Sequence, residues 1–306
     1  MTLAELDLDT VRRRMAGEGI ALRLPPITVR VRSPLAFFAE QIAGLYAFSE
    51  LGDVSAYADV DVRMLPTRGV RSLRDPHVHL VVDGTTPFEA FPLAHALPMF
   101  EWGLNWLFSH RMHDHLLLHA AVVERDGGAV LLPAWPGSGK STLAASLMCR
   151  GWRFLSDEFG VVQFADARVR PFVRPTGLKN VSIGVMRAFA PEAYIGPVFT
   201  NTRKGDVAHL RADADSVRRG TEAARVAAIV FPDFQAGEPA TVRLLEPATA
   251  LLKLAGNAFN YEVVGEPGFR TVTALVRSAK AHILRYGDLA DAHAALDALV
   301  RDAVAA

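Results

Sequence analysis

Cysteine is nearly absent from this sequence: Cys149 is the only one among 306 residues. A single cysteine excludes an internal disulfide framework and a zinc site built from several cysteines. It is typical of proteins held in a reducing compartment. The chain also starts without an apolar signal segment, so we expect a cytoplasmic protein.

Long apolar runs and an excess of charge are lacking as well. No run is long enough to cross a bilayer, so we expect no membrane span. Lys and Arg number 33, as do Asp and Glu, so no overall field favours a nucleic acid, and we expect none as a partner. With half of its residues hydrophobic, the chain has ordinary globular composition and room for two domains.

The sequence does contain a glycine-rich turn between a predicted strand, 129–132, and a predicted helix, 141–150. Strand, glycine-rich turn, Gly-Lys-Ser and helix are the order of a phosphate-binding loop, or Walker A motif. Backbone N–H groups of such a loop surround phosphate oxygens, and the helix adds its positive end. The predicted nucleotide-binding residues are Pro136, Gly137, Ser138, Gly139, Lys140, Ser141 and Thr142.

The residue types in the turn indicate how ATP and Mg²⁺ would be bound. Gly137 and Gly139 let the backbone turn inward without a Cβ in the way. Lys140 can reach the β- and γ-phosphates, and the Ser141 hydroxyl can ligate Mg²⁺. Ala134 stands where the motif has its first glycine, and we interpret it as a tolerated variant. A turn that merely happens to contain these residues is the alternative.

An acidic pair, Asp157-Glu158, follows Lys140 by 17 and 18 residues, at the end of the next predicted strand, 153–155. One carboxylate can hold Mg²⁺ while the other accepts a proton from an attacking hydroxyl. We therefore predict a metal site formed by Ser141, Asp157 and Glu158. The alternative is a solvated strand end.

Apolar periodicity and turn residues outline the rest of the chain. We place a soft boundary near residue 112, between an α+β N-terminal domain, 1–112, and a second domain, 113–306. The aromatic helix 99–111 is expected to pack between the two. Other predicted helices are 3–15, 35–48, 181–188, 267–280 and 289–305. Predicted strands are 22–24, 27–31, 59–65, 77–82, 116–124, 160–164, 167–173, 227–231 (stopped by Pro232) and 282–286. Irregular segments are 87–98 and the polar loop 195–206.

Several histidines and cations leave more than one interpretation open. The histidines at 110, 113, 115 and 119 cluster with Asp114, which suggests either a zinc site or, as we favour, a polar turn. His119 alone is either a core histidine or a group that tunes Asp157. Four cations could neutralise a transferring phosphoryl group, or could be surface charges: Arg174, Lys179, Arg203 and Lys204.

Over residues 118–162 the sequence resembles the HPr kinase/phosphorylases, which share a phosphate-loop core with phosphoenolpyruvate carboxykinases. Residues 101–106, 119–121 and 152–158 are similar to the HPr kinase-related kinase A group in particular. The resemblance rests on His119-Ala-Ala, 21 residues before Lys140, on Gly137-Ser-Gly-Lys-Ser141, on Arg150-Gly-Trp152, on Ser156-Asp-Glu158, and on Glu101-Trp-Gly-Leu-Asn-Trp106.

The resemblance implies catalytic roles for Asp157 and His119, which together with Lys140 of the loop and the cation Arg174 are the predicted catalytic residues. Asp157 matches the acid that activates the acceptor serine, and His119 matches a histidine beside that acid. Glu158 falls where the family usually has a second aspartate near the metal.

Two departures from the family pattern limit what is implied. Thr142 replaces an acid that commonly follows Lys-Ser in HPr kinases. The nearest segment to the family's Arg-Gly-x-Gly loop is 174–179, and that loop has been tied to the phosphorylase direction. Neither reversal of the reaction nor HPr as the substrate is therefore implied.

The sequence thus predicts an α/β P-loop kinase core of the HPr kinase and phosphoenolpyruvate carboxykinase type, behind an α+β N-terminal domain. The expected activity is ATP- and Mg²⁺-dependent phosphorylation of a hydroxyl, most fittingly a serine of a small protein or peptide encoded nearby. A homo-oligomer is allowed but not required. The alternatives are an ATP hydrolase or nucleotide-gated switch, a scaffold that recruits a partner through the 102–106 helix, and a small-molecule kinase.

Overall fold

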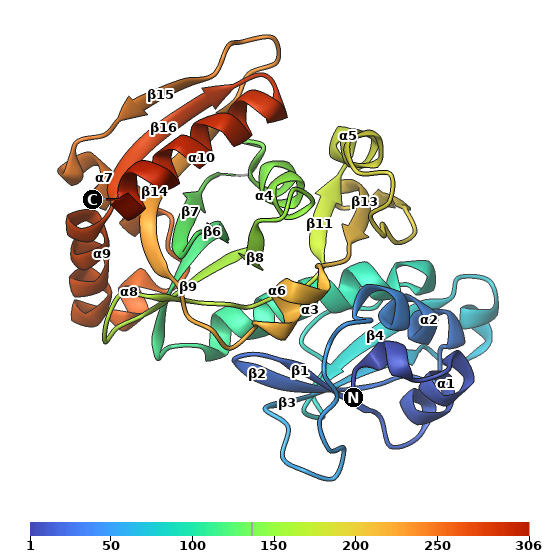
Figure 1. Cartoon of the computed structure of the whole chain (residues 1–306). Helices are drawn as coiled ribbons and strands as arrows, with labels where there is room; N and C mark the ends of the chain where they lie inside the picture. The colour runs from blue at the N-terminus through green and yellow to red at the C-terminus, as the bar shows by residue number, and fades with distance from the viewer. Residues whose placement is uncertain (136, 306) are drawn as a thin grey trace.

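An eight-stranded mixed sheet forms the larger half of the molecule (Figure 1). The computed structural model describes residues 1–135 and 137–305, without the side chains of residues 71 and 73. Within that range the chain is a mixed α/β protein with mixed sheets. Pairing is parallel between β7 and β14 and between β14 and β16, and otherwise antiparallel. In spatial order the strands are β10 (Val169–Arg170), β9 (Phe159–Gln163), β6 (His115–Arg125), β7 (Gly128–Pro133), β14 (Arg225–Phe234), β16 (Lys280–Tyr286) and β15 (Thr241–Leu244), with β8 (Arg153–Ser156) also paired to β6.

The central strands are buried on both faces, which explains their nearly continuous apolar sequence. Val130 and Leu132 of β7 pack towards α4 (Lys140–Met148) and α10 (Leu289–Ala305). Ala129 and Leu131 point to the opposite face and pack with α7 (Pro247–Gly256) and α9 (Glu266–Ser278). The period-two alternation of strand side chains therefore divides this half into two apolar layers.

The predicted strands 116–124 and 129–132 form an antiparallel hairpin before the phosphate loop. β6 and β7 pair antiparallel from Ala120↔Pro133 to Arg125↔Gly128. Asp126 and Gly127 both have positive φ, 51° and 80°, as a two-residue hairpin turn matched to the strand twist requires.

The N-terminal part forms a five-stranded sheet covered by helices. Its strands are β1 (Ile20–Leu24), β2 (Ile27–Arg32), β3 (Val60–Pro66), β4 (His77–Val82) and β5 (Phe91–Pro92). Its helices are η1 (Leu3–Glu5), α1 (Leu8–Ala16), α2 (Ala36–Leu45), η2 (Val70–Leu73), η3 (Leu93–His95) and α3 (Ala96–Arg111). Figure 1 shows α3 lying between this sheet and the rest of the molecule.

A small three-stranded sheet lies beside α3. It comprises β11 (Thr176–Lys179), β13 (Gly205–Leu210) and β12 (Phe199–Thr202), and α5 (Val181–Phe189) follows β11. The remaining short helices are α6 (Ala214–Arg218) and α8 (Tyr261–Val264).

Four sequence predictions were wrong. The polar segment 195–206 is not a loop but contains β12 and the start of β13, because pairing with β11 orders it. Pro232 does not stop β14; pairing with β7 ends at Ile229, so a residue without an N–H is tolerated beyond it. The strand expected over 167–173 is shorter and covers only β10. The segment 87–98, which was expected to be irregular, contains β5 and the start of α3.

Candidate functional site

The phosphate loop connects β7 to α4, and its glycines have the conformation that only glycine adopts readily. Gly137 and Gly139 have φ of 92° and 87°. A Cβ on Gly139 would also lie 2.6 Å from Tyr286 Oη, so space as well as φ requires glycine there. Ala134 is buried and is not among the positive-φ residues, so an alanine is accommodated without backbone strain. Pro136 lies outside the described residues.

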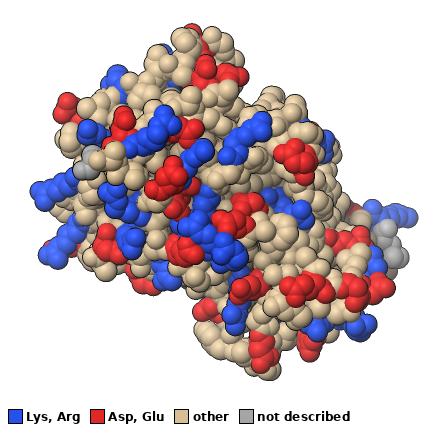
Figure 2. Space-filling model, in the orientation of Figure 1, with Lys and Arg blue, Asp and Glu red and all other residues tan. Residues whose placement is uncertain are grey.

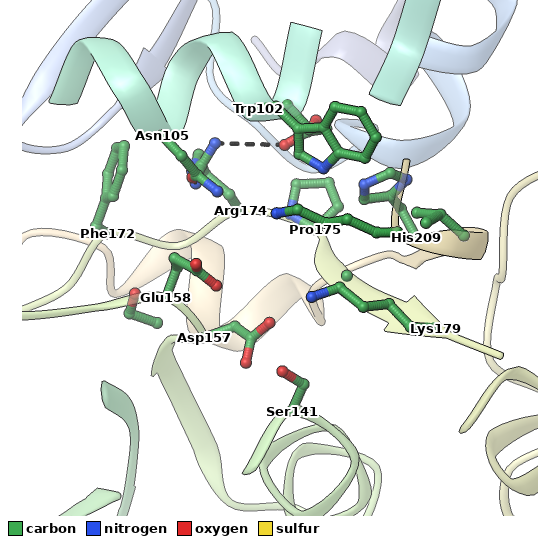
Figure 3. A pocket seen from close by; sticks show the side chains of 15 residues that line it. Trp102, Asn105, Ser141, Asp157, Glu158, Phe172, Arg174, Pro175, Lys179 and His209 are labelled. Atoms are coloured by element: carbon green, nitrogen blue, oxygen red, sulfur yellow. Dashed lines mark hydrogen bonds and ion pairs between the residues drawn. The ribbon is translucent and has the colours of Figure 1, made fainter. Parts of the chain in front are cut away.

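Lys140 joins the loop to the acidic pair. It is the first residue of α4, and its Nζ donates a hydrogen bond to the backbone carbonyl of Asp157 at 2.6 Å. The same Nζ lies 4.0 Å from Asp157 Oδ1 and 4.0 Å from Glu158 Oε2. The acids meet the loop because they lie between β8 and β9, which both pair with β6 beside β7. Figure 3 shows Ser141 facing Asp157 from α4.

The two neighbouring carboxyl groups have oppositely shifted pKa values. Burial raises the pKa of Asp157, although Lys140 and the Ser141 side chain act to lower it. Burial acts on the pKa of Glu158 in the same direction, but the nearby basic groups, Lys140 above all, outweigh it and the pKa lies below its ordinary value. Asp157 is therefore the better proton acceptor, and Glu158 the better permanent anion.

His119 faces Glu158 rather than Asp157. Its Nε2 lies 3.7 Å from Glu158 Oε1, and burial together with Lys140 lowers its pKa to about 4. The imidazole is therefore neutral at pH 7. Its backbone is held by Asn257 through two hydrogen bonds of 2.8 Å. The predicted effect of His119 on Asp157 stays a prediction, since the contact in the structure is with Glu158.

A small cavity, of about 50 Å³ and partly open to solvent, lies above the acidic pair (Figure 3). Its walls come from α3, from the segment after β10, and from the small sheet. The residues that line it are Glu101, Trp102, Asn105, Ser141, Ser156, Asp157, Glu158, Phe172, Arg174, Pro175, Gly177, Lys179, Lys204, Val207 and His209.

Arg174 lines this cavity, but its guanidinium binds helix α3. Nη1 lies 3.3 Å from Glu101 Oε2, and Nη2 donates to Asn105 Oδ1. Glu101 also accepts a hydrogen bond of 2.6 Å from the Tyr46 hydroxyl. Burial raises the pKa of Glu101, and burial and the Glu101 charge raise that of Tyr46 well above its usual range. The charge of Arg174 is thus largely compensated, which leaves two lysines as the other cations of the cavity wall.

No family model matches the sequence, and no curated protein matches it.

Sequence reasoning missed two contributions to the cavity. Helix α3 was expected only to pack between the halves, yet Glu101, Trp102 and Asn105 line the cavity. The signal was present, because polar Glu101 and Asn105 stand four residues apart on an otherwise aromatic helix. His209 of β13 is buried there too; burial and the nearby Arg174 lower its pKa to about 3. No local pattern marked it, because its strand was not predicted.

The histidines around residue 113 are not arranged as a metal centre. His110 Nδ1 contacts the Trp106 carbonyl at 2.7 Å, and His115 Nδ1 lies 2.9 Å from Asp114 Oδ1. Over the described ranges, no group of three or more His, Cys, Asp or Glu side chains could hold a metal ion.

Over the same ranges, no helix is long and apolar enough to cross a bilayer. On the face seen in Figure 2, acidic and basic side chains are interspersed.

Proposed function

We propose that this chain is a P-loop kinase of the HPr kinase-like type, which uses ATP and Mg²⁺ to phosphorylate a hydroxyl, most fittingly a serine of a small protein or peptide. The observation that carries the proposal is the position of Lys140 Nζ, 4.0 Å from both carboxylates of the acidic pair. The lysine of the phosphate loop thus lies beside a buried proton acceptor that lines the cavity, an arrangement suited to transfer to a hydroxyl.

The residues present fit a nucleotide and its metal. Among the described residues, Ser138 Oγ and Asp157 Oδ1 are buried without a hydrogen-bond partner. Ser141, Asp157 and Glu158 offer the oxygen ligands that Mg²⁺ prefers, and one or two carboxylates suffice because phosphates and water complete its shell. When bound, the metal would supply charge neutralisation on the phosphate oxygens.

Each of the chain's own groups then has a separate role in binding or in proton transfer. The loop amides and Lys140 bind the phosphates. Asp157 takes the proton of the acceptor hydroxyl. At the same time the hydroxyl oxygen of the acceptor bonds to the γ-phosphorus, and the bond between that phosphorus and the ADP oxygen breaks. The raised pKa of Asp157 favours its taking the proton. Glu158 remains anionic and helps to hold the metal.

The test is transfer of label from γ-labelled ATP to small proteins and peptides encoded nearby, with the modified residue located by mass spectrometry. Asp157→Asn is expected to lower transfer by about 10² to 10⁴ while ATP binding persists. Lys140→Ala is the contrasting variant, since it should weaken ATP binding as well.

Near-normal transfer by Asp157→Asn would remove the base from the mechanism. Steady phosphate release with no acceptor would favour an ATP hydrolase or nucleotide-gated switch instead. Tight ATP binding with neither release nor transfer would favour a scaffold.

A further inference from the structure

Two lysines reach the cavity from the small sheet. Lys179 ends β11, and Lys204 lies in the turn between β12 and β13. Figure 3 shows the ammonium end of Lys179 directed towards Asp157 and Glu158. Within the described part of the chain, neither ammonium group has an ion-pair or hydrogen-bond partner, in contrast to Arg174.

The turn that carries Lys204 rests on the N-terminal domain. Lys204 Nζ lies 5.2 Å from the centroid of the Trp102 ring, and Arg203 Cζ lies 5.0 Å from that of Phe91. His95 Nε2 contacts the Thr200 carbonyl at 3.1 Å. Residues 91–102 therefore contact the β12–β13 hairpin through three side chains, those of Phe91, His95 and Trp102.

The charges in the cavity call for an anion between the lysines. Burial and the like charge of Lys179 lower the pKa of Lys204, and Glu158 only partly offsets this. Two neighbouring unpaired cations repel each other, and a bound anion with several oxygens relieves that repulsion. An aromatic face holds an ammonium group without neutralising it, so the contact with Trp102 leaves Lys204 able to bind such an anion.

We infer that Lys179 and Lys204 together bind the terminal phosphoryl group of the nucleotide, and that Trp102 is a positioning residue that holds Lys204 at the cavity. This inference rests on the proposed kinase function. We call Lys179 and Lys204 together the phosphoryl clamp. The N-terminal domain then has a specific role, because its Trp102 orients Lys204.

Calorimetric titration of the full-length protein with Mg²⁺ and either ADP or a non-hydrolysable ATP analogue tests the clamp. Lys179→Met and Lys204→Met are each expected to weaken analogue binding about tenfold while ADP binding is unchanged. Lys253→Met is the matched control, because Lys253 lies 5.5 Å from the Phe231 ring but outside the cavity. It should change neither affinity.

Three variants test the positioning role. Trp102→Leu should lose analogue affinity as Lys204→Met does, whereas Trp102→Phe, which keeps an aromatic face, should retain most of it. The Trp102→Leu, Lys204→Met double variant should be no weaker than Lys204→Met alone, because both changes remove one interaction.

The outcomes separate this inference from the function on which it rests. If the wild-type chain binds neither nucleotide, the kinase proposal fails. If both nucleotides bind and the lysine variants keep the wild-type ratio of the two affinities, the clamp alone is wrong. If Lys204→Met loses the preference and Trp102→Leu keeps it, the positioning role of Trp102 is wrong.

Discussion

Among the described residues of the phosphate loop, Gly139 is the one at which both the backbone φ and the surrounding space require a glycine. Its φ of 87° disfavours any side chain, and a Cβ would lie 2.6 Å from Tyr286 Oη. At Gly137, with φ of 92°, no described atom outside its chain neighbours lies within 4 Å of the added Cβ.

We therefore expect Gly139→Ala to lower the unfolding midpoint in urea more than Gly137→Ala, which brings only the backbone strain of about 1–2 kcal/mol. Adding Tyr286→Phe to Gly139→Ala should recover part of the difference, because the nearest atom is then removed. Equal midpoints for the two alanine variants would show that the contact with Tyr286 does not matter.

The buried imidazole of His209 makes stability depend on pH. Its pKa is about 3 in the folded chain against an ordinary 6.5, so between these values the unfolded chain binds the proton and the folded chain does not. Above pH 6.5 both states hold His209 neutral, and its titration does not reduce the free energy of unfolding. As the pH falls from 6.5 towards 3, protonation of the unfolded chain lowers the free energy of unfolding.

His209→Gln removes that titration. The free energy of unfolding, measured by urea titration at fixed pH, should fall less steeply between pH 6.5 and 4 for the variant than for the wild type. Above pH 6.5 the two curves should run parallel, which serves as the internal control. Parallel curves over the whole range would contradict the burial of a neutral imidazole.

At the scale of elements, a buried polar network joins α2, α3 and the segment after β10. Arg174 reaches Glu101 and Asn105 of α3, and Glu101 reaches Tyr46 at the end of α2. Buried charges are tolerated when they are paired with a charge of opposite sign, so the network specifies how α2 and α3 sit against the cavity.

Glu101→Ala should destabilise the protein by about 3–5 kcal/mol, because it leaves the Arg174 guanidinium buried with its charge uncompensated. Tyr46→Phe should have a smaller effect, since it removes one hydrogen bond. The matched control is Glu40→Ala, which breaks the more exposed ion pair with Arg12 and should change stability little. Denaturant unfolding measures all three, and equal losses at Glu101 and Glu40 would contradict the network.

For the whole molecule, the N-terminal core does not end at the predicted boundary near residue 112. It includes apolar side chains from the second part of the chain, and the rings of Phe108 and Phe172 stack with centroids 3.9 Å apart. The later residues in this core are Leu117, Phe159, Val161, Phe172 and Phe199. The division into 1–112 and 113–306 stays a prediction, and any two such domains share their apolar contacts.

We therefore expect a single cooperative unfolding transition, with calorimetric and van't Hoff enthalpies that agree. Ser182→Ala, which removes two exposed hydrogen bonds between β11 and α5 away from the shared core, should leave one transition. Two resolved transitions in the wild-type chain would mean that the shared core does not couple the halves.

The sequence by itself determined the local features of the site. These features are short-range patterns, dictated by backbone conformation and by period-two and helical spacing. They are the glycines at 137 and 139, Lys140 at a helix start, and the acids after the next strand. The β6–β7 hairpin was predictable for the same reason, because its turn residues carry the required positive φ.

Only the tertiary structure decided what encloses those residues. Glu101 and Trp102 lie more than fifty residues before Asp157, and Lys204 lies more than forty after it, on a hairpin that reads as a polar loop. Its strands are ordered by pairing with β11 and by contacts with the N-terminal domain, and no local pattern encodes such partners. The cavity walls, and with them the compensation of Arg174 and the uncompensated lysines, depend on which distant surfaces the fold brings together.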